Sequence, residues 1–497
     1  MESAPARAFE PLRGDARTDV AVIGAGITGL TTAYMLASAG ARVMVVEAGS
    51  ICAGTTGFTT GKVTSQHSLV YARLAKHHGV ERATLYGQAQ QAAIERIAGI
   101  ASTESIDCNV TRNSAYVYTE DGARLDDLAE ELRVARECGL PAHEAHGDIG
   151  LPWAAAGAIR FDDQLLFHPR RYCLALAEAI ALRGGALVEQ TRATGVDDDK
   201  GGECVVTTER GTIRAGAVVL ATQLPFLDRG AFFARTEATR SYVVASRFER
   251  PPEGMYISID SPTRSIRPHT DSDGSVLIVG GGGHPTGRDE NAQQQYDDLE
   301  QFASDRFGMT AEWRWSAQDY VPADGLPFIG PITKGSPRTF VATGYAKWGM
   351  TNGTVAATVI SDAILGNDNP WRELFDPIRI DVPGSVGTVL SQVGHTIKSI
   401  VGDRVAMLTA DHVQDLAPGE GAVVKVDGHA VAAFRAADGI VTAVSARCTH
   451  LGCVVHFNNA ERTWDCPCHG SRFALDGQVI DGPATAPLDA VPAQQLL

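Results

Sequence analysis

The chain of 497 residues lacks the features that mark several large classes of protein. No apolar run approaches the roughly 20 residues that a membrane helix needs, so we expect no stable insertion into a membrane. The chain has no long basic run, and its formal net charge of -16 repels phosphate backbones, which argues against nucleic acid as a partner. Its polar start lacks the apolar middle of a secretory signal, so we expect a cytoplasmic protein.

Cysteine is scarce over most of the chain and crowded near its end. Five of the nine cysteines are scattered without metal-binding spacing, and we interpret them as buried thiols: Cys52, Cys108, Cys138, Cys173 and Cys204. The other four fall within one short window: Cys448, Cys453, Cys466 and Cys468. In a cytosolic protein, clustered cysteine and histidine favour a metal site over a disulfide framework.

A glycine-rich pattern lies near the start, where residues 19–47 read DVAVIGAGITGLTTAYMLASAGARVMVVE. The pattern predicts a strand, a tight turn, a helix and a second strand. Gly24, Gly26 and Gly29 fit GxGxxG, in which the glycines permit the turn, the approach of a pyrophosphate and close packing of helix on strand. Glu47 ends the second strand, where an acid would accept hydrogen bonds from an adenosine ribose. A glycine-rich turn in an unrelated α/β protein is the alternative, but the complete context favours dinucleotide binding.

Three later stretches carry a resemblance to a known family. They are AGAVVLAT, ending at Thr222, DGLPFIGPI at 324–332, and VATGYAKWGMTNGTVAATVISDAILG at 341–366. With the glycine pattern, they make the chain resemble the FAD-dependent amine and amino-acid oxidoreductases, the D-amino-acid oxidase and glycine oxidase group. The resemblance implies an α/β, Rossmann-like FAD-binding domain with an α+β substrate domain. It also implies a helix opening at 349–353 whose N-terminus would point at the flavin ring.

The resemblance also implies which residues bind FAD. The stretch GTTGFTTGKVTSQH at 54–67 would run along the ribityl chain and the ring, and it is similar to a subgroup that carries a C-terminal iron–sulfur domain. Beyond the fingerprint residues, the expected FAD contacts are Thr55, Thr56, Thr60, Thr222, Gly344, Gly349, Met350 and Thr351. No cysteine lies in the closing stretch, so we expect FAD to be bound without a covalent link.

The catalytic residues stay open at this point, because oxidation of an amine does not strictly need a protein base. The candidates near the flavin are Lys62, His67, Tyr345, Lys347 and Trp348. Each has a structural alternative, since histidine often caps or packs and tryptophan often fills a core.

The end of the chain predicts β-structure and two metal-binding loops. Alternating segments are separated by Asp-Gly turns at 427–428 and 438–439, and the loops CTHLGC at 448–453 and CPCHGSRF at 466–473 follow. A tetrahedral zinc site is the alternative, but C-x-H fits a zinc ribbon poorly. One cysteine and one histidine from each loop is the Rieske arrangement, in which two cysteines hold one iron and two histidines the other iron of a [2Fe–2S] cluster.

The two loops closely resemble those of the Rieske proteins in cytochrome bc complexes. The resemblance implies that Cys448 and Cys466 are thiolate ligands and that His450 and His469 are imidazole ligands. It further implies a disulfide between Cys453 and Cys468 that does not touch iron. The stretch DGPA at 481–484 resembles the loop that covers the cluster in those proteins.

We therefore expect three regions in the chain. An FAD-dependent oxidoreductase spans 1–376, with FAD-binding segments at about 18–65, 160–235 and 324–376 and substrate-domain segments between them. A linker at 377–403 contains an amphipathic helix at 385–403, for which a helix on a membrane surface is the alternative, and an all-β Rieske domain spans 404–497. Within the first region, 69–101 has a helical pattern, and 275–287 predicts a strand that runs into a glycine turn.

The combination of a flavin and a cluster suggests a function. A flavin takes two electrons from a substrate, whereas the cluster carries one at a time. We expect oxidation of a small amine, imino acid or amino acid, with electrons leaving through the cluster to a one-electron carrier protein or another acceptor. The alternatives are a reductase with inward flow, a Rieske oxygenase and a non-enzymatic redox sensor. The oxygenase needs a 2-His-1-carboxylate iron site, and the flavin resemblance argues against it.

The cluster loops also predict a reduction potential. Ser471 stands where high-potential Rieske proteins have a serine that bonds the cluster, but Phe473 stands where they have a tyrosine and offers no hydroxyl. Hydrogen bonds to the sulfurs raise the potential, so we predict a value below the top of the range of about -150 to +300 mV. A redox titration checks this, and a value at the ceiling would contradict it.

Overall fold

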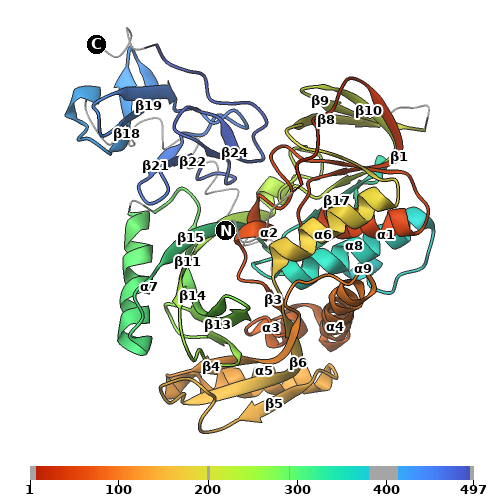
Figure 1. The fold of residues 1–497 in the computed structure, drawn as a ribbon, viewed down its shortest axis with the longest axis vertical. Helices are drawn as coiled ribbons and strands as arrows, with labels where there is room; N and C mark the ends of the chain where they lie inside the picture. Colours follow the sequence, from red (N-terminus) through yellow and green to blue (C-terminus); the bar gives the residue numbers. More distant parts are fainter. Residues whose placement is uncertain (1–6, 199–201, 290, 380–411, 493–497) are drawn as a thin grey trace.

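The computed structural model describes residues 7–198, 202–289, 291–379 and 412–492 (Figure 1). We call residues 7–379 the N-terminal part and residues 412–492 the C-terminal part. The N-terminal part contains two large sheets with helices packed on them, and the C-terminal part contains two small sheets. The fold class predicted from the sequence is thus confirmed. In the described residues, no helix combines the length and apolarity needed to cross a membrane.

The first sheet has eight strands, six of them in the order β16-β17-β10-β1-β2-β7, and β8 and β9 extend it beside β10. The strands are β1 Ala16–Ile23, β2 Val43–Val46, β7 Ala186–Val188, β8 Ala193–Asp198, β9 Cys204–Thr208, β10 Gly211–Leu220, β16 Phe328–Thr333 and β17 Ser336–Thr343. β1 pairs in parallel with both β10 and β2. Val20 and Val22 of β1 enter one hydrophobic core, while Ala21 and Ile23 enter the core on the other face. Burial on both faces explains the continuous apolar run of this strand.

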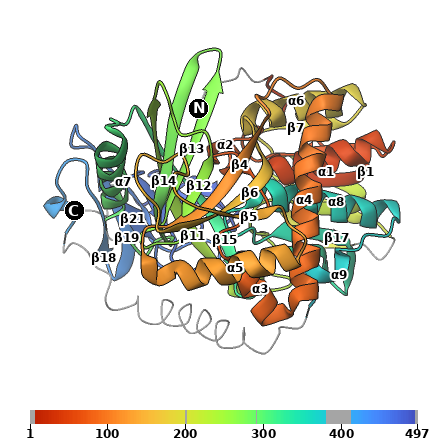
Figure 2. The same ribbon diagram turned by 90° about the horizontal axis from the view of Figure 1, so that it is seen from below.

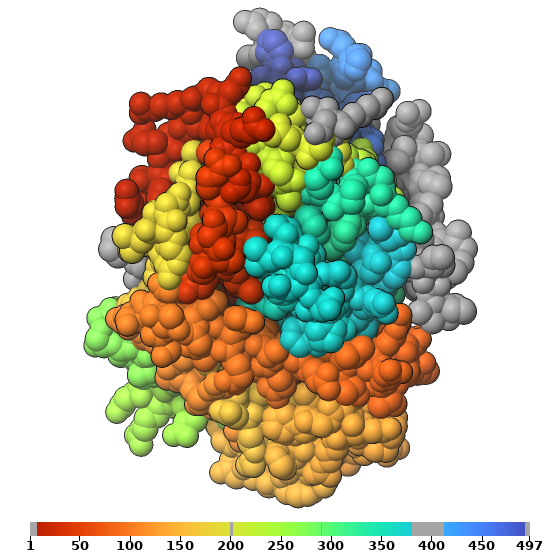
Figure 3. Space-filling view, turned by 90° about the vertical axis from the view of Figure 1, so that its right-hand side faces the viewer, coloured from red at the N-terminus to blue at the C-terminus, as the bar shows by residue number. Residues whose placement is uncertain are grey.

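Helices pack on both large sheets, and one short 3₁₀ helix lies in the C-terminal part. They are α1 Ile27–Ser38, α2 Thr55–Phe58, α3 Val70–His78, α4 Val80–Thr103, α5 Leu125–Glu137, α6 Pro169–Leu182, α7 Ala292–Phe307, α8 Gly349–Leu365 and α9 Arg372–Phe375, with short 3₁₀ helices η1 Gly122–Arg124, η2 Phe232–Ala234 and η3 Val413–Asp415. α1 packs between α6 and α8, as the red, yellow and cyan surfaces in Figure 3 show. The helical pattern at 69–101 forms α3 and α4, which separate at Gly79 because its φ is 86°.

The second sheet has nine strands, eight of them in the order β15-β11-β14-β13-β12-β4-β6-β3, and β5 pairs with β6. The strands are β3 Lys62–Val63, β4 Thr111–Thr119, β5 Ala142–Ala145, β6 Gly157–Leu166, β11 Thr236–Arg247, β12 Met255–Ser258, β13 Arg264–Asp271, β14 Gly274–Pro285 and β15 Trp313–Pro322. Figure 2 shows α5 lying along β5 and β6.

One sequence prediction in this sheet needs correction. Gly280 and Gly281 do not form a turn but continue β14, because each pairs with β11 on one side and with β13 on the other, and the turn follows only at 286–287. A side chain would clash with fixed backbone at Gly281 and would displace the mobile end of a lysine at Gly283. A Cβ at Gly281 would lie 2.7 Å from the carbonyl oxygen of Thr263, and one at Gly283 would lie 2.7 Å from Lys347 Nζ.

The C-terminal part is all-β, with the sheets β18-β19-β20 and β21-β22-β23-β24. The strands are β18 Gly421–Val426, β19 His429–Arg435, β20 Val441–Ser445, β21 His456–Asn458, β22 Thr463–Asp465, β23 Arg472–Phe473 and β24 Val479–Asp481. The predicted Asp-Gly hairpin between β18 and β19 is present, with φ of 47° at Asp427 and 83° at Gly428, as a type I′ turn requires. The linker helix predicted at 385–403 lies outside the described residues.

The two parts meet through a network of buried charges. Arg240 of β11, only 1% exposed, donates from Nη2 to Glu461 Oε2 at 2.5 Å. The same carboxylate oxygen accepts from Arg472 Nη2 at 2.8 Å, and Arg472 also bonds Asp465 and Asp481 at 3.1 and 3.0 Å. Burial by itself would raise the pKa of Glu461, but the charges of Arg240 and Arg472 hold this pKa below its ordinary value.

This network predicts a large effect of a single substitution. Glu461→Gln leaves the Arg240 guanidinium buried without this carboxylate, and breaking a buried pair from one side costs about 3–5 kcal/mol. We expect a loss of that size in the free energy of unfolding, measured by denaturant titration of the full chain. Glu130→Gln on α5 is the matched control, because Glu130 forms an exposed pair with Arg133, and the loss of an exposed pair costs little stability. Equal losses in the two variants would contradict the prediction.

Candidate functional site

A cavity of about 810 Å³ lies where the two large sheets meet the C-terminal part. Its walls come from the β1–α1 turn, the end of β2, α2, the Tyr345–Met350 loop, the β14 glycines and the segment Ile480–Thr485. Residues from both ends of the chain therefore share one cavity.

The β1–α1 turn is built so that only glycine fits at two positions. Gly24 has a φ of 103°, and a Cβ there would lie 2.4 Å from the carbonyl oxygen of Ala221. A Cβ at Gly29 would lie 1.9 Å from the carbonyl oxygen of Gly24. Gly24 and Gly26 line the cavity, whereas Gly29 lies beneath the turn and lets α1 pack onto it. This arrangement leaves the start of α1 open to an anionic group.

Glu47 also lines the cavity. Its Oε2 accepts from the backbone N–H of Ala25 and its Oε1 from that of Gly49, each at 2.8 Å. Burial raises the pKa of this carboxyl above its ordinary value. The two bonds fix the carboxylate beside the turn, and its remaining lone pairs can accept from a ribose hydroxyl.

The threonine-rich loop after β2 forms the next wall. Thr55 Oγ1 donates to the backbone carbonyl of Gln318 at 2.9 Å, and Thr56 Oγ1 accepts from the N–H of Ile27 at 3.2 Å. Thr60 and Thr222 line the cavity as well. The expected FAD contacts of this region are thus gathered around one space.

The closing loop contributes Tyr345, Lys347, Trp348, Gly349 and Met350 to the lining, while Gly344 and Thr351 lie outside it. Ala346 and Lys347 both adopt left-handed backbone conformations, with φ of 51° and 73°. Such conformations cost energy in non-glycine residues and concentrate at functional sites.

Asp319 of β15 holds this loop in place. Its Oδ2 accepts from the backbone N–H of Lys347 at 2.5 Å. Burial raises the pKa of Asp319 to about 6 and lowers the pKa of Lys347 below its ordinary value. The sequence prediction did not include Asp319, because β15 also contains Arg314, Ser316 and Gln318 and so offers no local pattern that marks one polar residue.

His67 lies behind the cavity rather than in its lining. Its Nδ1 bonds Tyr86 Oη and its Nε2 bonds the carbonyl of Thr64, both at 2.7 Å, and its ring stacks on Trp348 at 4.5 Å. Burial lowers the pKa of His67 to about 3, so the ring is neutral. The sequence left a catalytic role and a structural role open for His67, and these contacts favour the structural role.

Lys62 does line the cavity, on the side of the β14 glycines. Its Nζ donates to the carbonyl of Tyr256 at 2.8 Å and to Ser265 Oγ at 2.6 Å, which uses two of its three N–H groups. Burial, together with the charge of Arg267, lowers the pKa of Lys62 to about 7. The group is therefore suited to gain a negatively charged partner.

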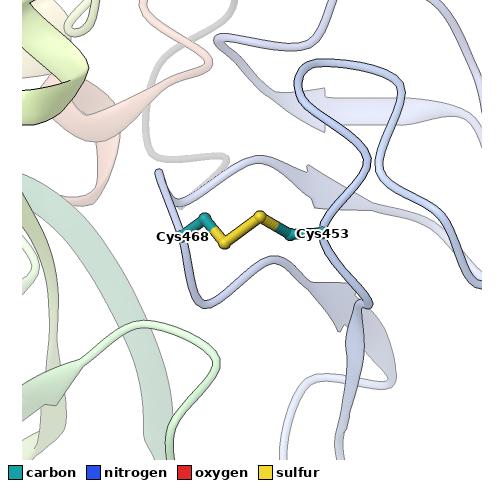
Figure 4. Close-up of a disulfide and its surroundings, with 2 residues drawn as sticks. All are labelled: Cys453 and Cys468. Atoms are coloured by element: carbon teal, nitrogen blue, oxygen red, sulfur yellow. A yellow bond between two sulfur atoms is a disulfide. The ribbon is translucent and has the colours of Figure 1, made fainter. Parts of the chain in front are cut away.

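The two cysteine loops of the C-terminal part are joined by a disulfide between Cys453 and Cys468 (Figure 4). The Cys466 sulfur lies within 4.8 Å of both disulfide sulfurs, but the bonded pair cannot supply thiolates. The thiols of Cys448 and Cys466 hydrogen-bond one another, which lowers the pKa of Cys448, and the backbone N–H of His450 adds to this effect.

The two histidines of these loops lie together, with ring centroids 5.0 Å apart. His450 Nδ1 and His469 Nε2 are buried, and neither has a hydrogen-bond partner among the described residues. Two paired thiols beside two imidazoles with free nitrogens are the donor set that a Rieske cluster needs, so the residues fit the group.

The segment Asp481–Ala484 connects this site to the cavity. It lines the cavity, and the backbone N–H of Ala484 donates to Ser471 Oγ at 3.0 Å. Tyr320 Oη of β15 donates to the carbonyl of His469 at 3.0 Å, and Gln318 Nε2 donates to that of Gly470 at 2.7 Å. Neither Gln318 nor Tyr320 belongs to a motif, so no pattern in the sequence predicts these contacts.

Comparison with known proteins gives two family matches. Residues 19–363 match the family described as FAD dependent oxidoreductase, and residues 406–492 match the Rieske [2Fe-2S] domain. The "Putative Rieske 2Fe-2S iron-sulfur protein YhfW" of Bacillus subtilis (strain 168) is 37% identical over 486 residues, which cover 97% of this chain and 95% of that protein.

Two further proteins match the N-terminal part. Gamma-glutamylputrescine oxidoreductase of Escherichia coli (strain K12) is 23% identical over 398 residues, covering 74% of this chain and 87% of that protein. The crystal structure of glycine oxidase from Geobacillus kaustophilus superposes with a TM-score of 0.63 at 21% identity, covering 73% of this chain and 99% of that one. The second match concerns the fold alone.

Proposed function

Because the chain belongs to the FAD-dependent oxidoreductase family and carries a Rieske [2Fe-2S] domain, we propose that it oxidises a small amine, imino acid or amino acid and passes the electrons through the cluster to an external acceptor. In this oxidation a carbon–nitrogen single bond of the substrate becomes a double bond, and two electrons and two protons leave the substrate. Bound FAD supplies a two-electron acceptor and the cluster a one-electron carrier. The amine named in the Escherichia coli relative supports this substrate class.

The shared cavity is the observation that carries the proposal. Ile480–Thr485 of the C-terminal part line the same space as Gly24, Glu47 and Lys347 of the N-terminal part. The segment that resembles the cluster cover of cytochrome bc complexes is thus a wall of the space that fits FAD. This adjacency supports electron exchange between the two cofactors within one chain.

The assignment of residues to the cofactors follows the same reasoning. Cys448 and Cys466 bind one iron and His450 and His469 the other, supported by the paired thiols and free ring nitrogens. FAD is held by the lining residues of the sequence prediction, which are Gly24, Gly26, Glu47, Thr55, Thr56, Thr60, Thr222, Gly349 and Met350. The boundaries at 376 and 404 are supported by the family matches, which end at 363 and begin at 406.

Lys62 supplies the anchor for a substrate carboxylate in this proposal. Lys62 lines the cavity together with the β14 glycines. Its Nζ makes two hydrogen bonds to the protein, which leaves one N–H group for a ligand. Gly283 leaves room beside Lys347 that a side chain would fill. An amino or imino acid would then place its carboxylate on Lys62 and its nitrogen-bearing carbon toward the closing loop.

Anaerobic mixing of the holoprotein with candidate amines and amino acids tests the function. We expect the oxidised flavin absorbance to fall first and the oxidised cluster spectrum afterwards, because substrate electrons enter at the flavin. Loss of the flavin absorbance on addition of a reduced one-electron carrier, without response to any amine, would point to a reductase. No response to either would point to a sensor. Both results would overturn the proposal.

Lys62→Met tests the carboxylate anchor through the pH dependence of carboxylate binding. Propionate carries the carboxylate but no amine, and its dissociation constant can be measured from the flavin absorbance. Because the pKa of Lys62 is about 7, the ammonium loses its charge as the pH rises through this value. We expect a constant affinity below pH 7 and a decline of up to about tenfold per pH unit above it.

In Lys62→Met the affinity should fall by about 10- to 100-fold at pH 6, the size of a hydrogen bond to a charged group, and the pH step should vanish. Lys334→Met, at an exposed lysine of the β16–β17 turn, is the control and should bind like the wild type. A pH step that persists in Lys62→Met would show that another group holds the carboxylate.

A further inference from the structure

A residue of the N-terminal part contacts one of the cluster histidines. Asp228 lies on the loop before η2, 222 residues from His450 in sequence. Its Oδ1 is 3.0 Å from His450 Nε2, and the His450 side chain is only 8% exposed. No other feature of the proposed function uses this carboxylate.

The contact determines how the His450 ring presents its nitrogens. A carboxylate accepts a hydrogen bond, so Nε2 carries the proton, and the lone pair is on Nδ1. His450 Nδ1 is buried and has no hydrogen-bond partner in the described parts of the chain. A metal-binding histidine typically donates its second N–H to a carboxylate or carbonyl in this way, which fixes the ring and makes it a more basic ligand.

The loop that carries Asp228 is shaped for this contact. Gly230 has a φ of 82° and Ala231 a φ of 48°, so the chain turns sharply between Asp228 and Phe233. The Phe233 ring then meets both imidazoles edge to face, with centroids 5.8 Å from His450 and 4.9 Å from His469. In Figure 1 this yellow-green segment lies beside the blue C-terminal part.

The two histidines are not equivalent in these surroundings. His450 has the Asp228 carboxylate, whereas His469 Nε2 is buried without a hydrogen-bond partner among the described residues. Asp228 therefore forms a hydrogen bond with only one imidazole of the pair.

We propose that Asp228 is a positioning residue for the cluster: it fixes the His450 ring with Nδ1 toward the iron and lowers the reduction potential of the cluster. This rests on the ligand assignment of the proposed function. Reduction adds one electron to the cluster, and a neighbouring negative charge opposes that addition. The more basic imidazole acts in the same direction, because it stabilises the more oxidised metal.

The test is a redox titration of the full-length holoprotein, followed by EPR of the reduced cluster. In Asp228→Asn the charge is lost while the shape is kept, and we expect the potential to rise. The population ratio of reduced to oxidised cluster at a fixed potential should change about threefold or more, which is about 28 mV at 59 mV per tenfold for one electron. Asp228→Glu restores the carboxylate and should bring the potential back toward the wild-type value.

Asp438→Asn is the matched control, because it removes one exposed carboxylate from a turn of the C-terminal part. Its potential should stay at the wild-type value, so an equal rise in both variants would overturn the role of Asp228. An unchanged potential in Asp228→Asn would overturn it as well.

Nitrogen hyperfine couplings in the same EPR samples separate this proposal from the ligand assignment. Two coupled imidazole nitrogens in wild type and in Asp228→Asn support the assignment, and the potential then decides the role of Asp228. Fewer than two in the wild type would show that the assignment itself is wrong, and the proposal would fall with it.

Discussion

Three consecutive residues of β15 hold the two cofactor regions against each other. The Gln318 carbonyl accepts from Thr55 in the loop expected along the flavin, while its side chain donates to Gly470 of the cluster loop. Asp319 fixes the closing loop through Lys347, and Tyr320 donates to His469. All three side chains are buried, where water cannot reach them. These hydrogen bonds therefore supply partners to polar groups that would otherwise have none. A shift of this strand would move both sites together.

This constraint explains why the cavity has walls from both ends of the chain. An isolated flavin fold would have to close the space above its turn with its own loops. Here Ile480–Thr485 close it, and their position follows from Tyr320, which also bonds the Gly482 carbonyl at 3.4 Å. The cluster region is thus part of the cavity wall. That geometry suits a protein in which a two-electron cofactor and a one-electron cofactor lie next to each other and exchange electrons.

The sequence could predict the elements whose residues are close together in the chain. The glycine turn with Glu47, and the paired loops that bear Cys448 and Cys466, each fold within one short unit, and both cofactors were predicted correctly from them. Contacts such as Gln318 to Gly470 join residues 152 positions apart and follow no local period. The β14 glycines were misread as a turn because their conformation depends on two partner strands.

The hydrogen bond between Asp228 and His450 can form only because the buried charges of the interface hold the two parts of the chain together. The Asp228 side chain is 62% exposed, and an exposed charge pair by itself contributes about 1 kcal/mol or less, too little to fix the position of a domain. The buried charges of Arg240, Glu461 and Arg472 can do so, because separating them would leave uncompensated charge inside the protein. The interface therefore sets where the loop of His450 lies, and Asp228 then fixes the orientation of the His450 ring within that loop.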